Sequence, residues 1–295
     1  MGNKKKDSWV IHLLFSLLSF GMIIPFVLVL IASFTDEKAI LANGYSFFPA
    51  QWSMDAYRYL FISDPGVILR SYGVTIAVTL IGLVLSLLVT SMLAYPLSRG
   101  ELPLKTALSF FIFFTILFNG GLVSWYLVYS TVWDLRDTIW ALIIPNLLLN
   151  GFNVLIMRTF FATTIPPALI ESAYIDGAGE LRIFAQFVIP LSKPVFATIG
   201  LFNTLAYWND WFNSLVFLSK AKFYSLQYLL NMSLLNIQFL SQKSQNASTA
   251  SLMDMIPQET MRMAMAIIGV GPIILAYPFF QKYFVKGLTI GSIKG

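Results

Sequence analysis

Long apolar runs separated by short polar segments dominate the chain. A helix of about 20 apolar residues spans the hydrocarbon core of a bilayer, and six runs reach that length. They cover residues 8–34, 70–97, 104–129, 138–161, 191–218 and 260–284. Asn119, Gly120 and Gly121 interrupt the third run, so its last part is expected to form a separate short helix. The pattern predicts an all-α fold, a polytopic membrane helix bundle with six transmembrane helices.

The spacing of these runs predicts a simple domain organisation. We expect a short tail over residues 1–7, a first transmembrane helix over 8–34, a helical core over 70–284 and a second tail over 285–295. Lys4, Lys5 and Lys6 precede the first run as in a signal peptide, but the run is too long for one and lacks a small-residue cleavage site. We therefore expect a retained anchor. Two longer polar stretches, 35–69 and 219–259, are expected to be loops, with an exposed tip at 241–251.

Charge indicates how the helices are oriented. Only 11% of the residues are charged, against about 25% in soluble proteins. The net charge of +5 comes from bases beside apolar runs, whereas nucleic-acid binding needs a basic stripe on a folded surface, so no nucleic acid is expected. With six spans, Lys and Arg outnumber Asp and Glu on the side that carries both termini. The positive-inside rule then predicts a multi-pass membrane protein with both termini in the cytoplasm.

The composition also excludes several kinds of chemistry. Cysteine is absent and His12 is the only histidine, so disulfides, thiolate sites and histidine metal sites are not expected. No G-x-x-x-x-G-K-[ST] motif occurs, so the chain has no P-loop to hold nucleotide phosphates. We expect no catalytic residue, metal or cofactor in this chain. Any transport must draw its energy from a partner or from an ion gradient.

One polar segment, at about 162–190, separates the fourth and fifth runs. Pro166 and Pro167 end the fourth run, and PALIESAYID then predicts a short helix that Gly177 and Gly179 stop. ELRIFAQFVI predicts a second short helix, which leads through Pro190 into the fifth run. Two such amphipathic helices could simply lie on lipid headgroups.

The order of residues in this segment resembles the EAA loop of ABC-importer permeases. That pattern reads Glu-Ala-Ala, three residues, Gly, nine residues, Ile-x-Leu-Pro. Glu171-Ser172-Ala173, Gly177 and Pro190 stand at the matching positions, with Ser172, Phe187 and Ile189 as departures that keep size or hydrophobicity. The stretches FNGGLVSWYLVYS, FNVLIMRTFF, WNDWFNSLVFL and YFVKGLTIGSIKG are similar to the carbohydrate branch related to the maltose permease. Within that branch, the chain looks closest to permeases for larger oligosaccharides such as alginate or pectin fragments.

The resemblance implies a function for the whole chain. It would be the permease subunit of an ATP-binding-cassette importer of the bacterial cytoplasmic membrane that moves a carbohydrate inward, an oligosaccharide in this branch, and not itself an enzyme. The implied partners are a second, different permease subunit, two cytoplasmic ATPases that bind ATP and Mg, an extracytoplasmic solute-binding protein and membrane lipid. Residues 287–295 would reach toward the ATPase, unless they form a disordered basic end.

The same resemblance assigns ATPase coupling to one set of residues in the loop: Glu171, Ser172, Ala173, Asp176, Gly177 and Ala178. The small side chains of Ser172 and Ala173 would allow close approach of the ATPase. Glu171 would offer a carboxylate to a base of the partner, and Gly177 would let the chain turn sharply.

Polar residues inside the apolar runs are candidates for a substrate pathway. Asn146, Asn150 and Asn153 are spaced to share one face of a helix in the fourth run. A second set follows in the fifth run: Asn203, Tyr207, Asn209, Asp210, Trp211 and Asn213. These side chains could line a sugar path, or they could form hydrogen bonds between packed helices. For Asp210, a lone acid in its run, we expect a pairing or gating role.

Two other functions stay open at this point. An ion-coupled secondary sugar transporter usually places acids or bases inside its spans. Here Asp210 is the one clear acid, with Glu259 and Arg262 near a boundary. A membrane scaffold that transports nothing is the other alternative.

Overall fold

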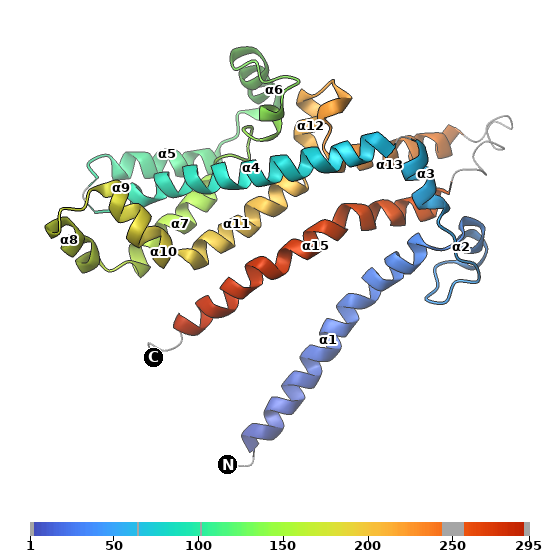
Figure 1. Ribbon diagram of the computed structural model, residues 1–295, viewed down its shortest axis with the longest axis horizontal. Coiled ribbons are helices and arrows are strands. Elements are labelled where there is room, and N and C mark those ends of the chain that lie inside the picture. The colour runs from blue at the N-terminus through green and yellow to red at the C-terminus, as the bar shows by residue number, and fades with distance from the viewer. Residues whose placement is uncertain (1–2, 64, 101, 244–256, 292–295) are drawn as a thin grey trace. The chain divides into compact units, whose positions relative to one another are not determined.

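The computed structural model describes residues 3–63, 65–100, 102–243 and 257–291, and these are largely helical (Figure 1). The backbone divides into two compact units. One comprises Met1–Ile68 and Leu230–Pro272, and the other Leu69–Leu229 and Ile273–Gly295. Within the described ranges, β-type backbone pairing is limited to an isolated bridge between Thr35 and Trp52. The predicted all-helical membrane fold is confirmed.

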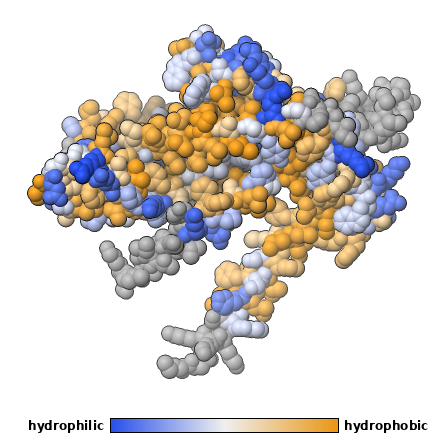
Figure 2. All heavy atoms as spheres, in the orientation of Figure 1, coloured by the Kyte–Doolittle hydropathy of each residue, from blue (hydrophilic) through white to orange (hydrophobic). Residues whose placement is uncertain are grey.

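Three helices are much longer than the others among the described residues: α1 (Asn3–Ser33), α4 (Pro65–Ser98) and α15 (Gln258–Gly291). Each contains a stretch long and apolar enough to cross a membrane: Trp9–Ser33, Gly66–Ser98 and Gln258–Lys282. The most apolar stretch of α1 buries none of its side chains within the protein. Exposure of so much apolar surface is unfavourable in water but favourable in lipid. In Figure 2, apolar residues prevail along α1 and along the visible side of α4.

Three further apolar segments are bent pairs of helices. The first joins α5 (Lys105–Leu117) to α6 (Gly121–Leu127) and a π-helical turn, Val128–Val132, at 118°. The predicted break near Gly120 is therefore present. The second joins α7 (Gly151–Thr164) to α8 (Pro167–Ile175) at 76°, and the third joins Glu180–Leu191 to α11 (Lys193–Trp208) at 81°. If each bent pair counts as one span by length and composition, the described residues contain up to six spans, which is the predicted number. The second and third pairs, however, include α8 and residues 180–190, which the prediction places outside the spans.

The fourth run differs from the prediction. Residues 138–161 do not form one helix, because only a 3₁₀ turn, Ile139–Leu142, and α7 are helical there. Pro145 has no N–H to donate, and Asn146 adopts a left-handed backbone with φ of 62°. Asn150 then caps α7 by accepting from the N–H groups of Phe152 (2.9 Å) and Asn153 (3.3 Å). The expectation that Asn146, Asn150 and Asn153 share one helical face is thus wrong.

The fifth run also breaks. Helix α11 ends at Trp208, and a short helix, α12 (Phe212–Phe217), follows after three residues that contain Asn209 and Asp210. At the far end of the chain, α15 continues to Gly291, so most of the predicted second tail is helical. Residues 292–295 lie outside the described residues.

The two stretches expected as loops contain helices of their own: α2 (Glu37–Asn43), α3 (Asp55–Ser63), a 3₁₀ turn (Ala221–Phe223) and α13 (Leu226–Lys243). Glu37 holds the start of α15, because its carboxylate accepts from the N–H groups of Glu259 and Thr260, both at 2.9 Å. A carboxylate at a helix N-terminus is favourable. Most of the predicted tip at 241–251 lies outside the described residues.

Candidate functional site

The segment between α7 and α11 folds as the two short helices that its prolines and glycines predict. Pro166 and Pro167 set the start of α8. After α8, Gly177 has a φ of +76°. The N–H of Gly177 donates to Tyr174 O and the N–H of Ala178 to Ala173 O, both at 2.9 Å. This pair of bonds is a Schellman cap, which favours glycine at the left-handed position. We call residues 162–190 the 162–190 loop.

The second helical part of the loop is irregular. It consists of α9 (Glu180–Ile183), a π-helical turn (Phe184–Val188) and α10 (Ile189–Leu191). Pro190 cannot donate a backbone hydrogen bond, and the N–H of Ile189 bonds back to Phe184 O. The apolar residues of the loop pack on a core that contains Leu97, Met157 and Ile183, all fully buried.

The side chains of the predicted coupling set divide into exposed and buried ones. Glu171, Ser172, Asp176 and Gly177 are exposed. Ala173 and Ala178 are only 4% and 9% exposed and belong to the core under the loop. The structure corrects the expectation that the small size of Ala173 serves approach of a partner, because this side chain faces the chain's own core. Ile175 and Leu181 add apolar exposed surface beside the polar residues.

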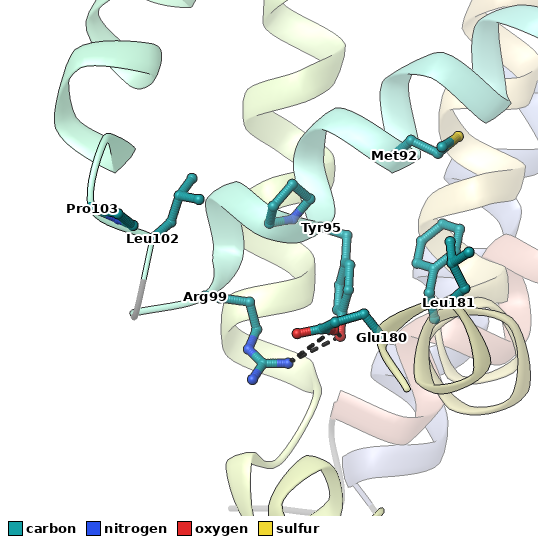
Figure 3. Close-up of a pocket in the computed structure, with 9 residues that line it drawn as sticks. Met92, Tyr95, Arg99, Leu102, Pro103, Glu180 and Leu181 are labelled. Carbon is teal, nitrogen blue, oxygen red and sulfur yellow. Dashed lines mark hydrogen bonds and ion pairs between the residues drawn. The ribbon is translucent and has the colours of Figure 1, made fainter. Parts of the chain in front are cut away.

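Four side chains that the sequence did not single out join this loop to the end of α4. Tyr95 and Arg99 come from the last turns of α4, Tyr174 from α8 and Glu180 from the start of α9. Tyr95 Oη donates to Glu180 Oε2 at 2.8 Å, and Tyr174 Oη donates to Glu180 Oε1. Arg99 lies 3.8 Å from the Glu180 carboxylate and points toward it in Figure 3. We call these four residues the Arg99 cluster.

The buried members of the predicted substrate pathway bond to one another and to the backbone. Asn153 Nδ2 donates to Asn203 Oδ1 at 2.9 Å, and Asn203 Nδ2 donates to Ser86 Oγ at 2.8 Å. These bonds link α7, α11 and α4. Tyr207 Oη donates to Ile143 O at 3.0 Å, and Asn213 Nδ2 donates to Pro145 O at 3.2 Å. For Asn153 and Asn203 the geometry matches the alternative of hydrogen bonds between packed helices, whereas Tyr207 and Asn213 bond to backbone carbonyls between the helical segments.

The other pathway candidates reach the surface. Asn146, Asn150, Asn209 and Trp211 are exposed and Asp210 is half-buried. Asp210 Oδ1 accepts from the N–H of Asn213 at 3.1 Å, so its carboxylate binds the first turn of α12. Ser225 Oγ donates to the backbone carbonyl of Asp210 at 2.9 Å. The pairing expected for Asp210 is therefore, at least in part, with the backbone of its own neighbourhood.

Asp137 is a further anchoring residue that the sequence did not indicate. Its backbone is left-handed, with φ of 57°. Its Oδ1 accepts from the N–H groups of Ser219 at 2.6 Å and Lys220 at 3.0 Å. The hydrogen bond from Ser219, together with the one from Lys220, lowers the pKa of this carboxyl group. Asp137 thus ties the turn before Ile139 to the residues after α12.

We expect Asp137→Asn to lower the thermal midpoint of the purified protein at neutral pH, because the amide accepts weaker hydrogen bonds than the carboxylate. A carboxyl group with a lowered folded-state pKa stabilises the fold above its unfolded-state pKa, and loses this effect as pH falls through the folded-state value. The difference between the two proteins should therefore shrink in acid. Asp134→Asn, in the same turn, is the control. An equal difference at every pH would contradict the role of ionised Asp137.

The fold and the site together define a polytopic helical membrane protein with an exposed two-helix loop. The family model described as binding-protein-dependent transport system inner membrane component matches residues 104–290. This match covers more than half of the chain and includes the whole 162–190 loop. The chain belongs to this family of inner-membrane transport components, and the predicted membership is confirmed.

Individual relatives agree over nearly the whole chain. The chain is 37% identical over 281 residues to the polygalacturonan/rhamnogalacturonan transport system permease protein YtcP of Bacillus subtilis, covering 95% of this chain and 96% of that protein. It is 28% identical to the melibiose/raffinose/stachyose import permease protein MelC of the same organism, covering 99% of each. A chain in the crystal structure of a bacterial ABC transporter involved in the import of alginate, an acidic polysaccharide, superposes with a TM-score of 0.78 at 27% identity, covering 96% of this chain and 98% of that one. The predicted function as an ABC-importer permease is confirmed.

Proposed function

We propose that this permease moves an oligosaccharide inward and that the 162–190 loop is where a partner ATPase drives it. The observation that carries the proposal is the exposed α8, Gly177 and α9 arrangement, which stands out from a largely apolar chain. The names of the relatives mention polygalacturonan and rhamnogalacturonan, then melibiose, raffinose and stachyose, and the acidic polysaccharide alginate. All of these are carbohydrates, which supports an oligosaccharide as the substrate class.

The proposed mechanism assigns the chemistry to a partner. Two ATPases bind ATP and Mg and receive the exposed face of the loop, with Glu171 as the carboxylate offered to a base. Closure of the ATPases moves the loop and reorients the membrane helices, so that the substrate pathway opens to the outside. ATP hydrolysis then returns the helices to their starting orientation. The loop and both chain termini then lie in the cytoplasm. An extracytoplasmic binding protein delivers the sugar to the opposite side, where the stretches 35–69 and 219–259 lie.

A second permease subunit completes the pathway in this proposal. Six spans are too few to enclose an oligosaccharide channel, so two subunits share the wall, and in this branch of the family the second is a different chain. Among the pathway candidates, the exposed members are the ones that remain available to a sugar. Asn146, Asn209 and Trp211 offer amides and an indole ring, which suit the hydroxyls and apolar faces of a sugar.

Glu171→Ala tests the assignment of the loop. In proteoliposomes with the partner permease, the ATPase and the binding protein, we expect substrate-stimulated ATP hydrolysis and uptake to fall by about tenfold, as the loss of a charged contact in an interface implies. Asp134→Asn, which neutralises an exposed carboxylate outside the loop and outside the stretches 35–69 and 219–259, should leave both unchanged. Normal stimulated hydrolysis in Glu171→Ala would contradict the assignment, and uptake driven by an ion gradient without ATP would favour the secondary transporter.

A cross-link tests docking directly. The chain contains no cysteine, so a single introduced thiol reacts without background. Ser172→Cys changes one exposed small side chain to another of similar size. We expect it to form a disulfide with a cysteine placed in the ATPase surface groove, and to do so more readily than Gln186→Cys. Equal reaction at the two positions would argue against docking through α8.

A further inference from the structure

We infer that the Arg99 cluster is the joint through which movement of the 162–190 loop is passed to α4, so that it sets how much transport each ATP drives. This inference rests on the proposed function of the loop as the docking site of the ATPase. It adds positioning residues that act behind the docking surface: Tyr95, Arg99, Tyr174 and Glu180.

One carboxylate holds three helices together. Glu180, at the first position of α9, accepts from the Tyr95 hydroxyl of α4 through one oxygen and from the Tyr174 hydroxyl of α8 through the other. Both short helices of the loop are thereby fixed to α4 at one point. Their relative orientation is fixed as well, because the two oxygens of a carboxylate are rigidly placed.

The Arg99 guanidinium completes the cluster from the α4 side. Its two terminal nitrogens donate to Tyr95 Oη at 3.0 Å and to Tyr174 Oη at 3.4 Å. Arg99 Cζ also lies 5.8 Å from the centroid of the Tyr95 ring and 5.5 Å from that of the Tyr174 ring, within the range of cation–π attraction. The Arg99 side chain is 17% exposed and that of Glu180 56% exposed. Partial burial and a charged partner make these bonds stronger than exposed neutral ones.

Two hollows lie beside the Arg99 cluster, so its hydrogen bonds supply much of the connection between the loop and α4 at this point. On one side lies a pocket of about 400 Å³, whose lining is mainly apolar and includes Met92 of α4, Leu102 and Leu181 of α9 (Figure 3). On another side lies a smaller hollow of about 170 Å³ beside Ser98 and Glu171. The apolar core beneath the loop also joins it to α4, but apolar contact is not directional and allows sliding. Hydrogen bonds from a rigid fork resist sliding and rotation.

The end of α4 is itself held firmly, so that it can receive this movement. Arg158 Nε, from α7, donates to the carbonyl of Leu97 at 3.2 Å, and Leu97 is fully buried. Nearer the N-terminus of α4, Ser86 Oγ accepts a hydrogen bond from Asn203 of α11. Displacement of α4 at the Arg99 cluster is therefore passed to helices that carry the pathway candidates.

Arg99→Met tests the joint, because it keeps an unbranched apolar stem and removes every donor. We expect the ATPase to remain docked, as measured by the Ser172→Cys cross-link, and ATP hydrolysis to continue. Sugar taken up per ATP hydrolysed should fall by about fivefold or more, the scale of a typical coupling between sites. Arg70→Met is the matched control, since Arg70 is an exposed base near the start of α4, at the other end of this helix from the cluster, and its replacement should leave the ratio unchanged.

Two further variants separate coupling from folding. Tyr174→Phe removes a single hydroxyl from an exposed ring, and we expect a smaller loss of about twofold in the same ratio. The double variant that combines Arg99→Glu with Glu180→Arg restores an ion pair with the charges exchanged. It should recover part of the sugar taken up per ATP hydrolysed that either change alone loses.

The outcomes distinguish the two proposals. An intact cross-link with an unchanged ratio in Arg99→Met and Tyr174→Phe would overturn the joint and leave docking standing. Failure of Ser172→Cys to cross-link in the otherwise natural chain would instead overturn the proposed docking surface, and the joint with it. An intact cross-link with a reduced ratio in Tyr174→Phe, and a normal ratio in Arg70→Met, would support both.

Discussion

Gly177→Pro is expected to abolish substrate-stimulated ATP hydrolysis and uptake. Proline fixes φ near −65°, whereas Gly177 has a φ of +76°. Proline also removes the N–H that donates to Tyr174 O. A proline in an incompatible position costs about 3 kcal/mol or more. Because Gly177 itself is exposed and has no atom within 4 Å of an added Cβ, the cost should fall mainly on the loop and reduce the docking-competent fraction by on the order of 100-fold.

The matched variants at this position separate backbone strain from bulk. A side chain added at Gly177 meets nothing within 4 Å, so only the backbone angle can be affected. Asparagine tolerates the left-handed region, and Gly177→Asn should keep most of the coupling, while Gly177→Ala should lie between. The measurements are stimulated ATP hydrolysis and the Ser172→Cys cross-link in the same proteoliposomes. Near-normal values for Gly177→Pro would show that the Schellman cap is not needed for docking.

The sequence predicts the loop well because local chemistry decides its shape. Pro166 and Pro167 begin a helix, and Gly177 ends it through a cap that spans only six residues. Signals of this kind act within one or two helical turns, so they can be recognised in the sequence without knowledge of the rest of the fold. The apolar runs are equally local, and they predict the long helices α1, α4 and α15 for the same reason.

The polar residues show where such reasoning fails. The spacing of Asn146, Asn150 and Asn153 fits a helix, but Pro145 and the capping side chain of Asn150 offer the backbone another arrangement. The Arg99 cluster joins residues up to 85 positions apart, and no periodicity signals such a contact. Helix α13 was missed for a different reason, because its polar flanks resembled a loop although LQYLLNMSLLNIQF carries helical spacing.

Gly82→Ala is expected to destabilise the helical core around Tyr207. A Cβ built at Gly82 of α4 lies 2.5 Å from Tyr207 Cζ, far inside van der Waals contact. Tyr207 is 2% exposed and its hydroxyl donates to Ile143 O. The ring therefore cannot move aside without losing that bond or separating α4 from α11. Overpacking of this kind costs roughly 1–3 kcal/mol, which exceeds the gain of about 1 kcal/mol from replacing glycine by alanine in a helix.

The same helix provides the control. At Gly73 an added Cβ meets nothing within 4 Å, so Gly73→Ala should leave the thermal midpoint of the detergent-solubilised protein unchanged or raise it slightly, whereas Gly82→Ala should lower it by several degrees. If the ring of Tyr207 is the obstacle, Tyr207→Leu should remove most of the additional cost of Gly82→Ala in a double-mutant cycle. Additive effects would mean that α4 and α11 do not approach each other at this glycine. A coupled result would instead fix the contact between α4 and α11 at Gly82, four residues before Ser86, whose hydroxyl joins the same helices through Asn203. The close approach of the backbones and the buried polar bond then depend on each other, because Ser86 can reach Asn203 only if no side chain separates the helices at Gly82.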